Sequence, residues 1–236
     1  MLGAKTAQER PAQPYAGFKL AHAALAADGE RAGFSGLSIG ASRVYGTIAE
    51  ASCVWTRRHA PPRRRCGCGF YCLNTLAEAR ALGCATANRA AVLLEVVASG
   101  RFIRYERGLR YSRQRVRAVR VGPCACGRPA RGLADTGRGL VGWRHLMPSC
   151  GACAANRAVV SFGDFAARLG GLVPVSADEG AAGWPAEIPG PPSPGGLPDA
   201  EAIVALGAEI ALVHARLDHL QARFSRLEGG PADDGS

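Results

Sequence analysis

Nine cysteines are the residues of this chain whose type and spacing point most directly to chemistry. Six of them stand in pairs with one or two residues between the partners: Cys66 and Cys68, Cys124 and Cys126, and Cys150 and Cys153. Such short gaps let two thiolates converge on one ion, at about 2.3 Å each for zinc. An odd number of cysteines without an N-terminal export signal argues against a disulfide framework. The pattern therefore predicts metal binding.

The two later pairs form the clearest predicted site, with Cys124, Cys126, Cys150 and Cys153 as its ligands. A long insert, 127–149, separates the pairs, and the arrangement resembles a zinc ribbon, in which each pair sits at the tip of a hairpin. His145 could replace one of the sulfurs. Buried free thiols are the alternative, but two spaced pairs rarely arise together by chance.

A second predicted site surrounds the first pair, in the segment CVWTRRHAPPRRRCGCG. This segment contains three cysteines and one histidine that could share an ion: Cys53, His59, Cys66 and Cys68. Cys72 competes with His59 for the fourth position, because a helix beginning near Phe70 would place its thiol one turn further on. The choice between His59 as a ligand and as an exposed loop histidine stays open at this point.

Both predicted sites are interpreted as structural. A catalytic zinc keeps an open coordination position, whereas four-cysteine sets are closed. The sequence contains no H-E-x-x-H, nucleophile elbow, P-loop or G-x-G-x-x-G motif, so we predict no enzyme activity. An iron–sulfur cluster is the alternative cofactor to zinc, since four thiolates serve it equally well. Cys84 lies in an Ala-rich helical stretch and is predicted to be a small core residue.

The charged residues divide the chain into two unlike parts. Residues 1–157 hold 25 basic and 8 acidic residues, a net charge of +17, whereas residues 158–236 hold 4 and 11, a net charge of −7. Nearly all of the basic residues are arginine, which a GC-rich genome favours by codon usage. Codon usage explains the choice of arginine over lysine but not the excess of positive charge, so the basic part predicts an anionic partner.

The elements that must position these residues follow from periodicity. Helices are expected at residues 15–27, 73–90 and 164–169, and strands at residues 91–98, 101–106, 110–121 and 158–162. Asn74 or Thr75 would cap the second helix, which has Glu78 near its first turn. The strand at 91–98 is apolar on both faces and should be covered, and Ser99-Gly100 is a tight-turn signal.

The third expected strand carries a row of arginines. Its period of two places Arg113, Arg115 and Arg117 on one face. The predicted nucleic-acid contacts are Arg101, Arg104, Arg113, Arg115 and Arg117, with Tyr105 and Tyr111 as stacking or packing partners. Phosphate contacts of this kind give affinity with little sequence specificity. Salt bridges to Glu95 or Glu106 are the alternative role of this face.

The last part of the chain predicts self-association. Apolar residues alternate spacings of three and four from Ile203 to Leu227, which is the seam of a coiled coil and favours a parallel dimer. The expected fold class is α+β: a small antiparallel β-sheet domain with zinc knuckles, then a Pro/Gly linker and a C-terminal coiled-coil helix. The predicted parts are an N-terminal tail and short helix at 1–50, the zinc-stabilised domain at 51–176, the linker at 177–198, the coiled coil at 199–229 and a tail at 230–236.

Residues 50–121 resemble a family known from uncharacterised proteins. The resemblance consists of His59-Ala-Pro, then Cys66-x-Cys68-Gly69-Phe70-Tyr71, a valine-rich strand at 92–97, and Gly100, Glu106, Arg107, Gly108 and Arg110. These motifs are similar to those of a Cys-rich domain of high-GC Gram-positive bacteria. That domain has no known activity, so the resemblance implies kinship alone, with a small residue where this chain has Cys72.

Three functions compete at the level of sequence. The first is a zinc-stabilised, dimeric module that binds nucleic acid with low specificity. A cytoplasmic location is expected because the N-terminus lacks the apolar core of a signal peptide. No membrane span is expected because the longest apolar stretch, 90–98, already contains Glu95. The second is a protein–protein adaptor with structural zinc, whose arginines form a solvated face. The third is an enzyme or redox sensor that uses Cys72 or Cys84, although neither thiol has an evident paired base.

Overall fold

The structure is a computed structural model that describes residues 14–37, 43–53, 58–84, 88–154 and 157–178. Its strands are β1 (Tyr15–Ala26), β2 (Ala32–Ser35), β3 (Val44–Tyr45), β4 (Ile48–Glu50), β5 (Phe70–Leu73), β6 (Ala91–Tyr105), β7 (Gly108–Val121), β8 (Gly132–Leu140), β9 (Trp143–Ser149), β10 (Val159–Val160) and β11 (Val175–Ala177). Its helices are α1 (Leu76–Cys84), α2 (Gly151–Ala154) and α3 (Phe162–Arg168). The predicted antiparallel sheet is thus confirmed for the described part of the chain, although it has eleven strands instead of a few and includes one parallel pair.

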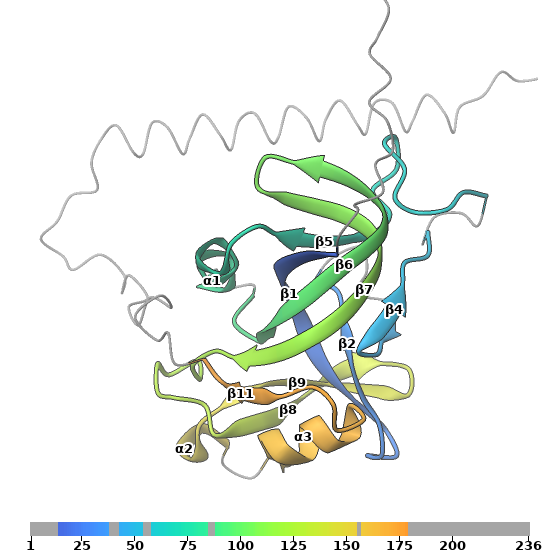
Figure 1. Cartoon of the computed structure of the whole chain (residues 1–236). Coiled ribbons are helices and arrows are strands. Elements are labelled where there is room, and N and C mark those ends of the chain that lie inside the picture. The colour runs from blue at the N-terminus through green and yellow to red at the C-terminus, as the bar shows by residue number, and fades with distance from the viewer. Residues whose placement is uncertain (1–13, 38–42, 54–57, 85–87, 155–156, 179–236) are drawn as a thin grey trace, which may run out of the picture. The chain divides into compact units, whose positions relative to one another are not determined.

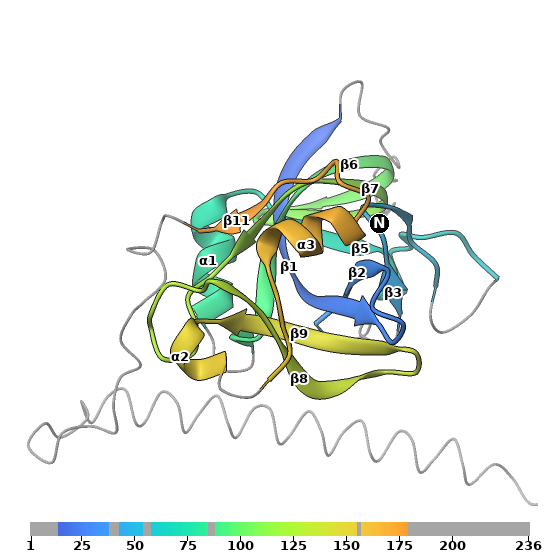
Figure 2. The same ribbon diagram turned by 90° about the horizontal axis from the view of Figure 1, so that it is seen from below.

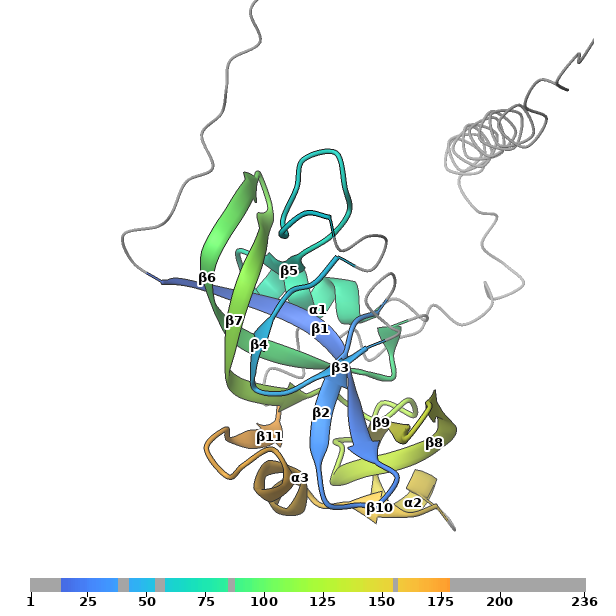
Figure 3. The ribbon, with the colours of Figure 1, turned by 90° about the vertical axis from the view of Figure 1, so that its right-hand side faces the viewer.

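The central strands pair in a closed circuit. β1 pairs with β6, β6 with β7, β7 with β5, and β5 returns to β1, all antiparallel. Figure 1 and Figure 3 show the long β6–β7 hairpin curving past β1, with β4 along its side. β1 continues beyond the circuit, where it pairs with β2 and β9, and β8 and β10 extend the sheet from β9. Two long strands, β1 and β7, therefore organise most of the sheet.

The first strand corrects a sequence prediction. Residues 15–27 were expected to form an Ala-rich helix, but β1 covers Tyr15–Ala26 as a strand. It is largely buried, with Ala21, Ala23 and Ala24 fully enclosed between neighbouring strands. Four pairing partners satisfy its backbone, and small alanine side chains let them pack closely on both faces. Packing in the sheet overrides the helix propensity of alanine here.

The β6–β7 hairpin corrects a second prediction. A turn was expected at Ser99-Gly100, but β6 runs unbroken to Tyr105 and the turn falls at Glu106 and Arg107. Gly100 takes a φ of +76° at a register shift, and the Arg101 N–H donates to Ser112 Oγ over 2.9 Å. Glycine at a β-bulge mimics the local signal of a turn, because both need a positive φ.

The helix after β5 begins where its cap predicted. The Thr75 hydroxyl accepts the Glu78 N–H over 3.3 Å and donates to the Glu78 carboxylate over 3.0 Å, which is a capping box. Of the two proposed caps, the structure uses Thr75. Helix α1 is shorter than the expected 73–90 and ends at Cys84, whose thiol donates to the Arg80 carbonyl and packs against a small apolar cluster.

The end of the described chain adds one strand that was not predicted. Strand β10 and helix α3 confirm the elements expected at 158–162 and 164–169, and Gly170 and Gly171 end the helix with positive φ. β11 then pairs in parallel with the end of β7. Figure 2 shows α3 and β11 from below, lying against the long strands. The coiled-coil seam from Ile203 to Leu227 lies outside the described residues.

The core lies within the sheet and continues beneath α3. Its largest fully buried side chains include Tyr111, Phe34 and Phe165, and the Phe34 and Phe165 rings meet edge to face at 6.1 Å. Tyr111 is therefore a packing residue rather than an exposed stacking residue. No helix in the part of the chain that the structure describes is long and apolar enough to cross a membrane.

Candidate metal centres

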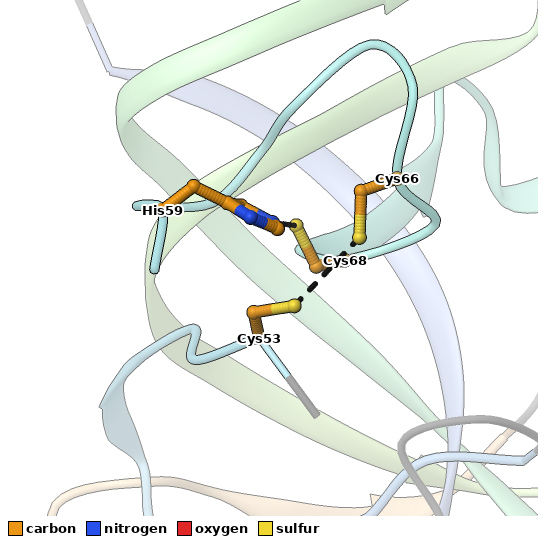
Figure 4. A group of neighbouring side chains, drawn as sticks. All are labelled: Cys53, His59, Cys66 and Cys68. Carbon is orange, nitrogen blue, oxygen red and sulfur yellow. Dashed lines mark hydrogen bonds between the residues drawn. The ribbon is translucent and has the colours of Figure 1, made fainter. Parts of the chain in front are cut away.

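The first cysteine pair meets two upstream residues in one group, which we call the Cys/His cluster. Figure 4 shows the side chains of Cys53, His59, Cys66 and Cys68 pointing toward one another. One ligand atom from each lies within 4.8 Å of all the others. Cys53 Sγ is 3.7 Å from Cys66 Sγ, and His59 Nε2 is 3.2 Å from Cys68 Sγ. Thiolates bound to one tetrahedral zinc ion are about 3.8 Å apart, given bonds of about 2.3 Å, so the sulfur spacing fits a single ion.

A loop between β4 and β5 carries this cluster. Cys53 follows β4, and Cys68 precedes β5 with Gly69 between it and the strand. Gly69 has a φ of +116°, and a Cβ there would lie 3.2 Å from the Tyr111 carbonyl oxygen. Glycine is needed for the backbone to turn from the knuckle into β5 so close to β7.

Arg110 on β7 braces the loop from the sheet. Its guanidinium donates to the carbonyl of Cys66 over 2.5 Å and to the carbonyl of Arg63 over 3.0 Å. The side chain is buried, with only 4% of the residue exposed. A buried arginine that donates to two carbonyls of this loop holds the loop backbone against β7 in the folded protein. Sequence patterns did not identify this role, because Arg110 lies far beyond Cys68 in the chain.

Cys72 lies apart from the cluster. It sits within β5 instead of one turn into a helix, and its thiol faces Gly17 on β1, where an added Cβ would lie 2.5 Å from the sulfur. Burial raises the pKa of this thiol to about 11. The strand therefore directs Cys72 into the core, and the structure groups His59 with the three cysteines instead.

The two later pairs meet in a second group, which we call the all-cysteine cluster. Ligand atoms of Cys124, Cys126, Cys150 and Cys153 all lie within 4.8 Å of one another, and Cys126 Sγ is 3.6 Å from Cys150 Sγ. Cys124 and Cys126 follow the end of β7, Cys150 follows β9, and Cys153 belongs to α2. The cluster thus joins the ends of β7 and β9, two strands that lie in different parts of the sheet order.

The knuckles are placed differently from those of the predicted zinc ribbon. The insert between them folds as the β8–β9 hairpin, and the two pairs lie at the open base of that hairpin instead of at hairpin tips. A tight turn closes the first pair, since the Gly127 N–H donates to the Cys124 carbonyl over 2.8 Å and Gly127 has a φ of +84°. His145 points elsewhere, with its ring stacked on His22 at 5.1 Å.

Local hydrogen bonds prepare the all-cysteine cluster for a cation. The backbone N–H of Cys153 lowers the pKa of the Cys150 thiol to about 6, so this sulfur is poised as a thiolate. Hydrogen bonding with its three neighbours raises the pKa of Cys153 to about 12. In the Cys/His cluster, burial raises the pKa of Cys68 to about 11. Thiolates are the form that binds metal.

The predicted arginine row is exposed on the outer face of β7. Arg113, Arg115 and Arg117 all reach solvent and line one groove of about 790 Å³. Strand pairing explains the groove, because Ile48, Arg115, Val97 and Ala16 lie side by side across β4, β7, β6 and β1. These four strands thus present a basic face with an apolar floor.

Two details of this face differ from expectation. Arg113 forms an ion pair with Glu50 at 2.7 Å, whereas Glu95 pairs with Arg120 on the same strand. Of the other two predicted contacts, Arg104 is exposed and its guanidinium lies over the Tyr15 and Phe102 rings, and Arg101 is half-buried. Arg101 and Arg104 do not line the groove.

Comparisons of the chain with protein-family models, with curated proteins and with solved structures found no match.

Proposed function

We propose that the described residues form a metal-stabilised binding module with zinc in both clusters. The two sets of four converging ligand atoms carry this proposal. Each set is closed, and a closed tetrahedral set suits structural zinc, which leaves no position for substrate. Thiolate ligands also require a reducing compartment, so we place the protein in the cytoplasm. Metal analysis of the purified protein by mass spectrometry, with thiol counting, tests the proposal.

A single zinc ion fits better than an iron–sulfur cluster. In both groups the four ligand atoms lie within 4.8 Å of one another. In an iron–sulfur cluster the thiolates bind separate iron atoms and stand further apart. A visible absorption spectrum distinguishes the two cofactors, because zinc thiolates are colourless and iron–sulfur clusters are brown.

The basic face is the proposed nucleic-acid surface. The observation that carries this step is the alignment of Arg113, Arg115 and Arg117 in one groove. Successive outward residues of a strand are about 6.8 Å apart, close to the spacing of phosphates along a nucleic-acid strand. Glu50 pairs with Arg113 alone, so Arg115 and Arg117 keep their positive charge. The side chains of Arg113 and Glu50 are 62% and 69% exposed, so this ion pair is weak and exchanges readily with other partners. The face would therefore hold a phosphate backbone without reading bases.

The test is the salt dependence of binding. Replacing Arg113, Arg115 and Arg117 by alanine should flatten the log–log salt slope by about 2 to 3 units. The matched control removes the same charge elsewhere, with alanine at the exposed Arg131, Arg138 and Arg157. An equal change in both variants, or no binding at low salt, favours the protein–protein adaptor instead.

Two other parts of the proposal rest on separate grounds. The buried, protonated Cys72 supports a non-enzymatic role, because a thiol with a raised pKa is a weak nucleophile. The heptad seam from Ile203 to Leu227 supports a dimer. Deleting residues 199–236 should convert that dimer to a monomer in light scattering and leave the metal content of the body unchanged.

A further inference from the structure

We infer that Tyr71 and Tyr105 form a stacking site for the bases of single-stranded nucleic acid. This inference rests on the proposed function and names the form of nucleic acid that the basic face accepts. The site lies beside the Cys/His cluster, at the opposite end of β7 from the all-cysteine cluster. It joins the tyrosines to Arg110 and to the arginines of the metal loop.

The two tyrosines enclose one arginine. The Arg110 guanidinium carbon lies 5.6 Å from the Tyr71 ring centroid and 5.8 Å from that of Tyr105. Tyr71 is the register partner of Arg110 on β5, and Tyr105 stands opposite Gly108, two residues before Arg110 on β7. Gly108 lets β5 approach β7 closely here, because a Cβ at this position would overlap the Cys72 carbonyl oxygen.

Each ring uses only part of its surface for this contact. Tyr71 and Tyr105 are both 48% exposed, whereas Arg110 is 4% exposed. The arginine is consequently covered by the rings, and the rings keep an open surface toward solvent. An exposed aromatic surface attracts an unpaired base, since every base has a π-face.

Hydrogen bonds hold the Tyr71 ring in place before a ligand arrives. Its hydroxyl donates to the Gly67 carbonyl over 3.1 Å and accepts from the Arg110 guanidinium over 3.2 Å. Arg110 is itself fixed by the carbonyls of Cys66 and Arg63. A ring that is already ordered loses less conformational freedom on stacking, so more of the contact energy appears as affinity.

The charge around the rings matches a phosphate backbone. Residues 51–72 contain five arginines and no acidic residue, and Arg63 and Arg65 are exposed on the metal loop. Along β7, the exposed Arg113, Arg115 and Arg117 begin three residues after the buried Arg110, about 10 Å further along the strand. Acidic peptides would satisfy the charges but leave the two rings without stacking partners. Duplex bases are already stacked, so a single strand is the occupant that uses both features.

The experiment compares two 10-mers that differ only in their bases. One is fluorescein-labelled oligothymidylate, and the other has the same phosphates with abasic sugars. Changing Tyr71 and Tyr105 to leucine keeps Arg110 covered but removes the π-faces. Affinity for oligothymidylate in fluorescence anisotropy should fall roughly 5- to 150-fold for each stacked base, and affinity for the abasic strand should stay unchanged. Phenylalanine at both positions should restore binding.

Each outcome decides the inference. Equal losses of affinity for the two oligonucleotides, or no loss for either, overturn the inference. The proposed function still stands in that case if the variant with alanine at Arg113, Arg115 and Arg117 has a flatter salt slope. Failure of the unaltered protein to bind either strand overturns both. Binding of polyglutamate with the same dependence on the rings assigns the site to an acidic protein. If the double variant loses metal, the single variant Tyr105→Leu is used in its place. Tyr105 contacts Arg110 only through its ring face, whereas the Tyr71 hydroxyl also donates to the metal loop.

Discussion

The two candidate metal clusters of this chain are built in opposite ways. The Cys/His cluster takes all its ligands from one loop, 53–68, and β7 braces that loop through Arg110. The all-cysteine cluster takes two ligands from the end of β7 and two from the end of β9 and the start of α2. One cluster therefore orders a surface loop, whereas the other connects two parts of the sheet.

The neighbourhoods of the clusters explain how each is organised. The β8–β9 hairpin between the two cysteine pairs contributes to the core, with Leu133 and Leu146 almost fully buried, although Cys126 and Cys153 are exposed. Its turns are closed by their own backbone hydrogen bonds. The loop of the Cys/His cluster adds fewer residues to the core and depends on a side chain from elsewhere. Short ligand spacing can thus produce either a link between two strand ends or a loop that needs support from a distant side chain.

The largest expected effect is the loss of the ion in the all-cysteine cluster. Cys150→Ser should reduce zinc from two ions per chain to one and lower the free energy of unfolding by several kcal/mol, part of the about 10–16 kcal/mol by which structural zinc stabilises finger peptides. Cys53→Ser should also remove one ion but cost less, because only a loop loses its restraint. Zinc analysis and thermal unfolding measure both effects. Equal destabilisation by the two variants would break the comparison, and full zinc retention in Cys150→Ser would remove the assignment of the all-cysteine cluster.

The second-largest expected effect tests the contact between Arg110 and the loop of the Cys/His cluster. Arg110→Met should weaken zinc binding at the Cys/His cluster by about 10- to 100-fold, because the carbonyls of Cys66 and Arg63 lose their donor. The all-cysteine cluster should keep its affinity. Competition with a chromophoric chelator resolves the two sites when the Cys150→Ser background is used as a reference.

The matched control for the brace is Arg120→Met. Arg120 lies on the same strand, ten residues beyond Arg110, and pairs with Glu95 at 2.5 Å and with Asp178 at 3.9 Å instead of with the loop of the Cys/His cluster. It should leave both zinc affinities unchanged. If Arg110→Met lowers the zinc affinity of both clusters equally, Arg110 does not act specifically on the loop of the Cys/His cluster. The proposed difference between the two sites would then be wrong.

The smallest effect concerns the turn into β5. Gly69→Ala should destabilise the protein by about 1–2 kcal/mol and lower zinc affinity at the Cys/His cluster, since Gly69 has a φ of +116° and a Cβ would lie 3.0 Å from Arg110 Cγ. Gly137→Ala is the control, with a φ of +71° but no atom within 4 Å of the added Cβ. This control should lower the free energy of unfolding only by the cost of a positive φ at alanine, measured by urea unfolding. Its zinc affinity should not change.

Ligand positions were predictable from sequence because metal coordination is a local demand. Gaps of one or two residues bring thiolates together whatever fold surrounds them, so Cys66 with Cys68 and Cys124 with Cys126 stood out. The arginine row on β7 was also visible, since alternation in a strand is a local pattern. The Thr75 cap followed from side-chain chemistry within one helical turn.

What escaped prediction depends on residues far apart in the chain. Alanine in β1 is helical by propensity, and only its four strand partners decide otherwise. The brace on Arg110, the Glu50 partner of Arg113 and the parallel pairing of β11 each join segments that are distant in sequence. No local pattern encodes such contacts. The resemblance to the Cys-rich family stays a prediction.

The spacing of the Cys/His ligands has a consequence for how the protein is made. Synthesis proceeds from the N-terminus, so all four ligands are available once residue 68 has emerged from the ribosome, before β6 or β7 exists. The ligands of the all-cysteine cluster are complete only at residue 153, after both strands of the long hairpin have been translated. With zinc as the ion, the nascent chain would bind its first ion while it is still a short peptide. It would bind its second ion when most of the sheet has been synthesised. If both clusters hold zinc, the order in which the two ions bind follows from the order of the ligands in the chain.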